Sequence, residues 1–173
     1  MDMFNYKIKG KVICDNRIYD TTPIFDNELY STIKKYSDIL FICSGGKNGK
    51  DLKDYPVYPA CYDLPNVICV AAVDNQGNLY RMSGYGDSVD LAAPGVNILS
   101  SMADGKYMYS DGTSVATAHV TGIAALVKSY SPELSAEEIA NILRKSVTKT
   151  ARLENKVATN GIIDATMCLK NAK

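Results

Sequence analysis

The sequence DGTSVATAHVTG, from Asp111 to Gly122, is the most informative stretch of the chain. Gly112 allows a sharp backbone turn, and the residues from Thr113 to Ser129 then form a helical pattern that is apolar nearly all round. A helix of that composition is typically buried, and its small side chains would allow close packing on a sheet. The stretch therefore predicts a sharp turn into a buried helix that packs against β-structure.

Ser114 would lie in the first turn of this helix, where two interpretations are open. The helix dipole is positive there, and the Ser114 N–H would be one of the donors without an intrahelical partner. That arrangement suits a nucleophile whose attack creates an oxyanion. Alternatively, the hydroxyl of Thr113 or Ser114 merely caps the helix, as Ser and Thr often do. The local sequence does not decide between the two.

Outward from this stretch, strand-like and helical patterns alternate. Apolar runs predict strands, and the strands at 38–43 and 66–73 are expected to be buried. Two further segments could pair with each other across a turn at 103–105. Helical spacing appears at 27–36, and a capping box from Ser135 to Glu138 begins another helix. The alternation predicts an α/β fold with a mostly parallel sheet. The remaining predicted strands are 11–14 and 90–95, and the pairing segments are 96–100 and 106–109.

Composition excludes several classes of function. The 173 residues suit one domain, and 19 basic residues balance 19 acidic ones, so nothing favours nucleic acid or a membrane surface as a partner. The tyrosines at 55, 58 and 62 are interpreted as loop packing rather than base stacking. There is no apolar run long enough to span a bilayer and no signal-like apolar core at the start, so a cytoplasmic location is expected.

The five cysteines do not resemble a metal site. Their number is odd, no pair has Cys-x-x-Cys spacing, and the chain has one histidine. Cys43 and Cys69 lie within apolar runs and are expected to be buried, reduced thiols. The carboxylates form no cluster with convincing spacing. We therefore expect neither a metal site nor a cofactor.

The segment from Gly112 to Ala116, followed by His119, Val120 and Gly122, closely resembles the nucleophile motif of subtilisin-like serine proteases, usually Gly-Thr-Ser-Met-Ala followed by His-Val-x-Gly. The resemblance extends from about Val12 to the C-terminus, with further landmarks in the family's order. It implies that residues 1–173 are one partial peptidase domain, the C-terminal portion of the doubly wound subtilisin-type fold with helices on both faces of a mostly parallel sheet. It also implies a serine endopeptidase with Ser114 as nucleophile. The landmarks are 56–60, 71–74 and 92–96.

The family's triad runs Asp, His, Ser along the chain, and the segment that bears the first two has no counterpart here. His119 is the only histidine, and five helical residues rotate it about 140° from Ser114, so it points away. A packed, hydrogen-bonded role is expected for it. The chain alone is therefore expected to be inactive. It is a fragment of an active protease, a pseudoprotease that binds or scaffolds, or half of a complemented enzyme.

A second departure from the family lies at the oxyanion site. The strand at 39–43 continues into Ser44-Gly45-Gly46-Lys47-Asn48, where the family has Ala-Ala-Gly-Asn, so Lys47 takes the place of the oxyanion asparagine. Three interpretations are open. Lys47 is a solvated loop residue at a site that has lost its function, or Asn48 takes the place of the oxyanion asparagine after the loop shifts by one residue. In the third interpretation, Lys47 acts as a base or stabilises the oxyanion. A base role would require a pKa depressed by burial.

The resemblance also places the substrate-binding walls. One wall corresponds to Asp15, Asn16 and Arg17, where the charges either alter a neutral peptide-binding edge or are a solvated strand end. The other corresponds to Ser44, Gly45 and Gly46, small enough for an extended peptide to add as a strand. Asp111 is interpreted as a turn acceptor. Because half of a doubly wound sheet exposes an edge and apolar surface, self-association or a complementing chain is expected.

Overall fold

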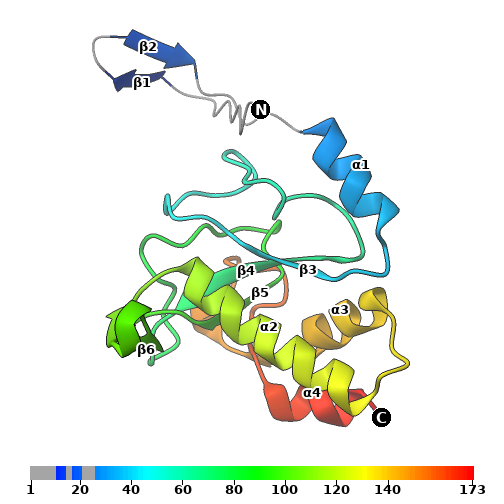
Figure 1. The fold of residues 1–173 in the computed structure, drawn as a ribbon. Helices are drawn as coiled ribbons and strands as arrows, with labels where there is room; N and C mark the ends of the chain where they lie inside the picture. Colours follow the sequence, from blue (N-terminus) through cyan, green and yellow to red (C-terminus); the bar gives the residue numbers. More distant parts are fainter. Residues whose placement is uncertain (1–10, 15–16, 21–25) are drawn as a thin grey trace.

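The computed structural model describes residues 11–14, 17–20 and 26–173. Figure 1 shows the order of the elements along the chain. The helices are α1 (Asn27–Lys35), α2 (Thr113–Tyr130), α3 (Ala136–Lys145) and α4 (Ala165–Asn171). The strands are β1 (Lys11–Cys14), β2 (Arg17–Asp20), β3 (Phe41–Ser44), β4 (Val67–Val73), β5 (Leu91–Pro94), β6 (Ile98–Ser101), β7 (Tyr107–Ser110), β8 (Val147–Lys149) and β9 (Gly161–Ile163).

The largest sheet has the strand order β3-β4-β5-β9-β8. Its first four strands are parallel, and β8 pairs antiparallel with β9. The interior strand β4 is buried at every residue, as expected for a strand whose two faces are both covered. The predicted α/β fold with a mostly parallel sheet is confirmed.

The two faces of β4 belong to different cores. Ile68, Val70 and Ala72 pack with α2, α3 and α4, whereas Cys69 and Ala71 face buried residues of the loops. On the second face, α1 packs through Ile33 against the start of β4. Figure 1 shows α2 crossing the sheet with α3 and α4 beside it, and α1 separate from them. Helices therefore cover both faces, as the family resemblance implied.

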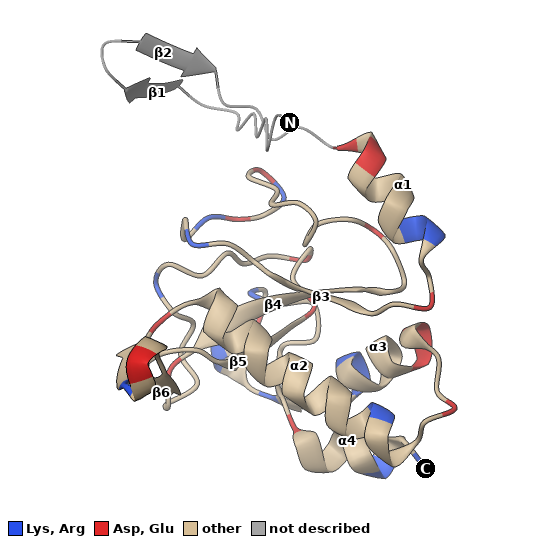
Figure 2. Cartoon of the chain, in the orientation of Figure 1, with Lys and Arg blue, Asp and Glu red and all other residues tan. Residues whose placement is uncertain are grey.

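The long helix α2 corrects one expectation. The opposite side is exposed, including Leu126 at 47%, whereas the buried residues form one stripe, which consists of Thr113, Ala116, Val120, Ala124 and Val127. The prediction of a helix buried all round was wrong because the sheet covers one side only. Within the described part of the chain, no element covers the other side. Figure 2 shows that α2 carries almost no charge.

Strand β3 also differs from its prediction. It begins at Phe41 rather than Asp38, and its four residues are only half-buried, although the run was expected to be buried. The reason is its place in the sheet, because β3 has a neighbour, β4, on one side only. The predicted pairing after β5 is confirmed, since β6 and β7 form an antiparallel hairpin. No described helix has the length and apolarity that crossing a membrane requires.

The predicted strand at Lys11–Cys14 is present as β1, which pairs antiparallel with β2. The proposed substrate wall at Asp15, Asn16 and Arg17 falls where the sequence passes from β1 to β2. Asp15 and Asn16 lie outside the described residues, and Arg17 is the first residue of β2.

Candidate functional site

The N-terminus of α2 meets the carboxyl ends of β3, β4 and β5. Gly95, just after β5, donates its N–H to the Val73 carbonyl at 2.9 Å and accepts the N–H of Gly112 at 2.7 Å. A Cβ on Gly95 would lie 2.7 Å from the Gly112 oxygen and 3.0 Å from the Ala116 Cβ. Only glycine fits there, so the turn before α2 is docked closely on the sheet.

Gly112 is the N-cap of α2. Its φ of 149° lies in the region that favours glycine, and no side chain caps the helix at this residue. The Gly112 carbonyl accepts the N–H groups of Val115 and Ala116, each at 3.2 Å. The interpretation that Thr113 or Ser114 caps the helix is therefore wrong, because both residues lie inside it.

Thr113 connects the helix to the end of β3. It is buried, and its hydroxyl donates to the Gly46 carbonyl at 2.9 Å. The Ser44 hydroxyl lies 2.9 Å from the Thr113 hydroxyl and also accepts the Gly46 N–H at 3.4 Å. Because the single hydroxyl proton of Thr113 goes to Gly46, Ser44 is the donor in their shared bond. Sequence analysis missed this role, although Thr113 stands within the Gly-Thr-Ser motif.

Ser114 itself is exposed in the first turn of α2. Within the described part of the chain, its hydroxyl has no hydrogen-bond partner, and its N–H lies among the first-turn donors at the positive end of the helix. A Cβ on Gly112 would lie 3.4 Å from the Ser114 Oγ. The hydroxyl is therefore free to contact an incoming group above the N-terminus of α2.

Of the other predicted site residues, Ser44 and Gly46 are hydrogen-bonded to Thr113, the residue before Ser114. Gly45 extends the pairing of β3 by donating its N–H to the Val70 carbonyl at 2.9 Å. Lys47 and Asn48 follow in an exposed loop, where Asn48 Oδ1 accepts the Lys50 N–H at 3.2 Å. Among the described residues, neither Lys47 nor Asn48 has a hydrogen bond to Ser114.

His119 on α2 was expected to be packed and hydrogen-bonded, and only the second expectation is confirmed. His119 Nδ1 lies 3.2 Å from the Val115 carbonyl oxygen of its own helix, so it is hydrogen-bonded as expected. It is exposed rather than packed, because it lies on the side of α2 that the sheet does not cover. It borders a groove of about 450 Å³ between α2 and β6, which Leu99 and Leu126 also line.

Asp111, just before the helix, accepts the Asn97 N–H on Oδ1 at 2.5 Å, so it is an acceptor, but its partner lies 14 residues away along the chain rather than within its own turn.

Three free thiols lie on the sheet face opposite α2. Cys43 and Cys69 are register partners on β3 and β4, and Cys61 Sγ accepts the Val57 N–H at 3.3 Å. Burial, followed by the charges of Asp90 and Cys61, raises the pKa of Cys43 to about 11, so this thiol is protonated at neutral pH. Cys69 is buried as predicted, but Cys43 is only half-buried because β3 is an edge strand.

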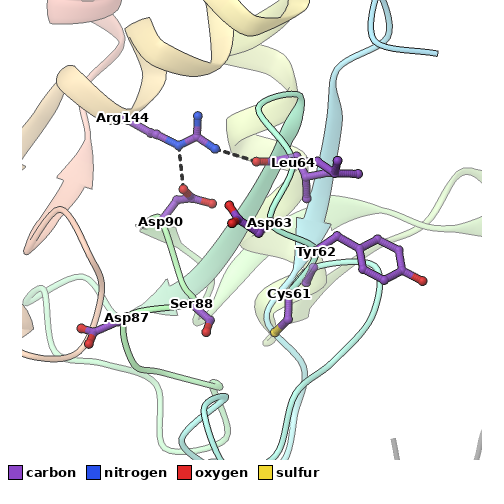
Figure 3. A pocket seen from close by; sticks show the side chains of 10 residues that line it. Cys61, Tyr62, Asp63, Leu64, Asp87, Ser88, Asp90 and Arg144 are labelled. Carbon is purple, nitrogen blue, oxygen red and sulfur yellow. Dashed lines mark hydrogen bonds and ion pairs between the residues drawn. The ribbon is translucent and has the colours of Figure 1, made fainter. Parts of the chain in front are cut away.

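A pocket of about 270 Å³ lies near the start of β5, and sequence analysis did not find it (Figure 3). Arg144 of α3 donates from Nε to Asp90 Oδ1 and from Nη2 to the Val67 carbonyl, both at 2.7 Å. The other Asp90 oxygen accepts the Cys69 N–H at 2.6 Å. The positive charge of the Arg144 guanidinium thus balances the negative charge of Asp90, which accepts hydrogen bonds on both of its carboxylate oxygens. Within the described residues, no three His, Cys, Asp or Glu side chains are grouped to hold a metal ion.

Comparisons with known proteins agree with this geometry. Subtilisin-like protease 3 of Plasmodium falciparum (isolate 3D7) is 34% identical over 184 residues, which cover 95% of this chain and 24% of the relative. Subtilisin-like protease 1 of Plasmodium berghei (strain Anka) is 44% identical over 131 residues, which cover 70% and 22%.

Solved structures give the same answer. The A-subunit of the AB5 toxin from E. coli matches with a TM-score of 0.72 and 29% identity, over 84% of this chain and 55% of that one. A cold-adapted subtilisin-like serine proteinase matches with a TM-score of 0.72 and 27% identity, over 81% and 50%. The chain thus spans about half of these solved chains and about a quarter of the two Plasmodium relatives. A model of the subtilase family matches residues 17–162, and the chain belongs to that family.

Proposed function

We propose that this chain is the nucleophile-bearing part of a subtilisin-like serine endopeptidase and that Ser114 is its nucleophile. The observation that carries the proposal is the placement of Ser114. Its free, exposed hydroxyl stands at the N-terminus of α2, and the neighbouring Thr113 ties that turn to the end of β3. A rigidly held hydroxyl at the positive end of a helix is suited to acyl transfer.

In this mechanism, Ser114 Oγ bonds to the carbonyl carbon of a peptide and its proton passes to a base. The carbonyl oxygen becomes an oxyanion, which the Ser114 N–H and the helix dipole stabilise. The intermediate expels the amine, and water then releases the acyl group from Ser114. A second oxyanion donor would come from Asn48, whose Oδ1 accepts the Lys50 N–H while its Nδ2 has no partner among the described residues, or from Lys47.

The peptide would pair with Ser44, Gly45 and Gly46. Gly45 donates its N–H inward to β4, and the Gly46 N–H and carbonyl are engaged with Ser44 and Thr113, so the peptide would pair with the remaining backbone groups at the outer edge of this segment. The first turn of α2 is within one hydrogen bond of the same segment, through Thr113 and Gly46. An extended peptide along this edge therefore has a route past the Ser114 hydroxyl.

No base for this reaction is found in the described part of the chain. His119 is engaged with Val115 on the same helix, and Lys47 is exposed, without the burial on which a base role depends. Removing triad members lowers kcat about 10⁴–10⁶-fold, a magnitude known from subtilisin, a member of this family. We therefore expect negligible peptidase activity from these 173 residues on their own.

A second candidate function is that of a binding module or a complementing half. The observation that favours it is the uncovered apolar side of α2, together with β3 at the edge of the sheet. A further polypeptide on these surfaces would bury them, and one that carried an aspartate and a histidine would complete the triad. A module that has lost catalysis would use the same surfaces for binding only.

Labelling of the full chain with a fluorophosphonate probe tests the proposal. The chain by itself should be labelled slowly or not at all, and mixing it with a polypeptide that supplies the base should give labelling that Ser114→Ala abolishes. Ser129→Ala, which changes an exposed serine at the other end of α2, is the matched control and should be labelled like the unaltered chain. Rapid labelling that survives Ser114→Ala would refute the assignment of the nucleophile.

A further inference from the structure

The exposed loop after β3 contains one of the two Asn-Gly pairs of the chain, Asn48-Gly49, and the other pair is Asn160-Gly161. An asparagine loses its side-chain nitrogen as ammonia when the next backbone nitrogen bonds to its side-chain carbon. Glycine is the following residue that hinders this approach least, because it has no Cβ. The two pairs share this local chemistry, and the fold decides which of them can react.

Gly49 is required by the shape of its loop. Its φ of 63° lies in the left-handed region that favours glycine, and a Cβ there would lie 2.6 Å from the Arg81 carbonyl oxygen. Its N–H donates to the Met82 carbonyl at 3.0 Å, and this hydrogen bond must open before the nitrogen can react. Because the residues on both sides, Asn48 and Lys50, are exposed, the bond can open without disturbing a strand.

The Asn48 side chain folds back toward this nitrogen. Its Oδ1 accepts the Lys50 N–H at 3.2 Å, so the side chain curls over the Gly49 peptide group that lies between them. A hydrogen bond to Oδ1 draws electron density from the side-chain carbon and makes that carbon a better electrophile. Lys47 and Lys50 are exposed close to the pair, and their positive charges favour the negatively charged nitrogen that attacks.

Asn160 is held in a different way. It is half-buried, its Oδ1 accepts the Asn155 N–H at 3.2 Å, and its carbonyl accepts the Thr150 N–H at 3.0 Å. Gly161 is buried as the first residue of β9, where a Cβ would lie 2.6 Å from Val147 Cγ2. Ring closure at this pair would have to break the pairing of β8 with β9.

We propose that Asn48 is a site of spontaneous deamidation in the folded chain. The Gly49 nitrogen bonds to the Asn48 side-chain carbon, the bond from that carbon to Nδ2 breaks, and Nδ2 leaves as ammonia with the proton that Gly49 gives up. Water then opens the cyclic imide at either carbonyl and gives aspartate or isoaspartate. The modification goes beyond the proposed function, and one consequence rests on it: a negative charge replaces the Nδ2 donor and would repel an oxyanion formed at Ser114.

Peptide mapping by mass spectrometry of the full chain, aged at mildly alkaline pH, tests this proposal. An isoaspartate methyltransferase labels the isoaspartate that forms. Deamidation at Asn48 should be at least about tenfold faster than at Asn160, because unpairing β9 adds to the barrier and a tenfold change in rate needs only about 1.4 kcal/mol. In urea, where both pairs are unfolded, the two rates should become similar.

Two variants are the controls. Asn48→Gln should stop the modification at residue 48, because glutamine would have to close a larger ring, and Asn160→Gln should leave the rate at Asn48 unchanged. The proposal is refuted if the folded chain reacts at Asn160 as fast as at Asn48, or if Asn48 stays intact while the unfolded chain reacts at both sites. Because the readout is mass, a failure of Ser114 labelling would not alter this result, and an intact Asn48 would not alter the assignment of Ser114.

Discussion

Thr113 holds the candidate site together more directly than the nucleophile does. Its hydroxyl, 2.9 Å from both the Gly46 oxygen and the Ser44 hydroxyl, joins the first turn of α2 to the end of β3. Thr113→Val keeps the shape but leaves both partners without this bond. Since an unsatisfied buried polar group costs about 1–3 kcal/mol, the free energy of unfolding should fall by that amount in urea denaturation followed by circular dichroism.

Thr113→Ser is the control for this prediction, because it keeps the hydroxyl and should lose less stability than Thr113→Val. Equal stability of Thr113→Val and the unaltered chain would contradict the proposed role. Sequence analysis identified Ser114 but not Thr113, and the cause is physical. The partners of Thr113 are 69 and 67 residues away along the chain, so no local pattern around Thr113 indicates them.

Between α1 and the sheet, one buried side chain connects three segments. Asn66 is 1% exposed, and its Nδ2 lies 3.2 Å from the Ile33 and Tyr36 carbonyl oxygens and 2.9 Å from that of Ile39. It thereby satisfies the carboxyl end of α1 and fixes the start of β3. Asn66→Asp would place a carboxylate against three carbonyl oxygens, so a loss of at least about 2 kcal/mol in unfolding free energy is expected.

Thermal unfolding and hydrogen exchange of the α1 amides would measure this effect, with exchange in α1 rising more than in α3. Asn75→Asp is the matched control, because Asn75 is exposed in a turn where aspartate is equally suitable. The prediction fails if the two variants have the same stability.

For the helices and strands, sequence patterns that depend on neighbouring residues predicted the structure correctly, and properties that depend on distant partners were not predicted. The capping box at the start of α3 is present, with Glu138 Oε2 accepting the Ser135 N–H at 2.7 Å. The apolar run of β4 correctly predicted a buried strand. For β3 and α2, the element types were right and the burial was wrong. Apolar composition reports what an element is able to bury, and the number of neighbours decides what it does bury.

The surface of the whole molecule is unusually apolar in one region. Large hydrophobic side chains on the β6–β7 hairpin and on α2 are between about half and three-quarters exposed, and two of them, Leu99 and Leu126, line the same groove. Exposed apolar patches usually mark interaction sites. This region borders the groove between α2 and β6. The side chains are Leu99 (56%), Met102 (48%), Tyr107 (72%), Met108 (46%), Tyr109 (62%), Leu126 (47%) and Tyr130 (53%).

The isolated chain is therefore expected to self-associate, since two copies can bury apolar area on each other at about 25 cal/mol per Å². Light scattering after size exclusion should give a mass above that of the 18.8 kDa monomer, rising with concentration. Leu126→Lys should shift this equilibrium towards monomer. Tyr55→Lys should not, although Tyr55 is similarly exposed at 44%, because it lies in the loop before β4. A monodisperse monomer at all concentrations would mean that this apolar region does not mediate self-association. The proposal that a second polypeptide covers α2 would then lose its main support.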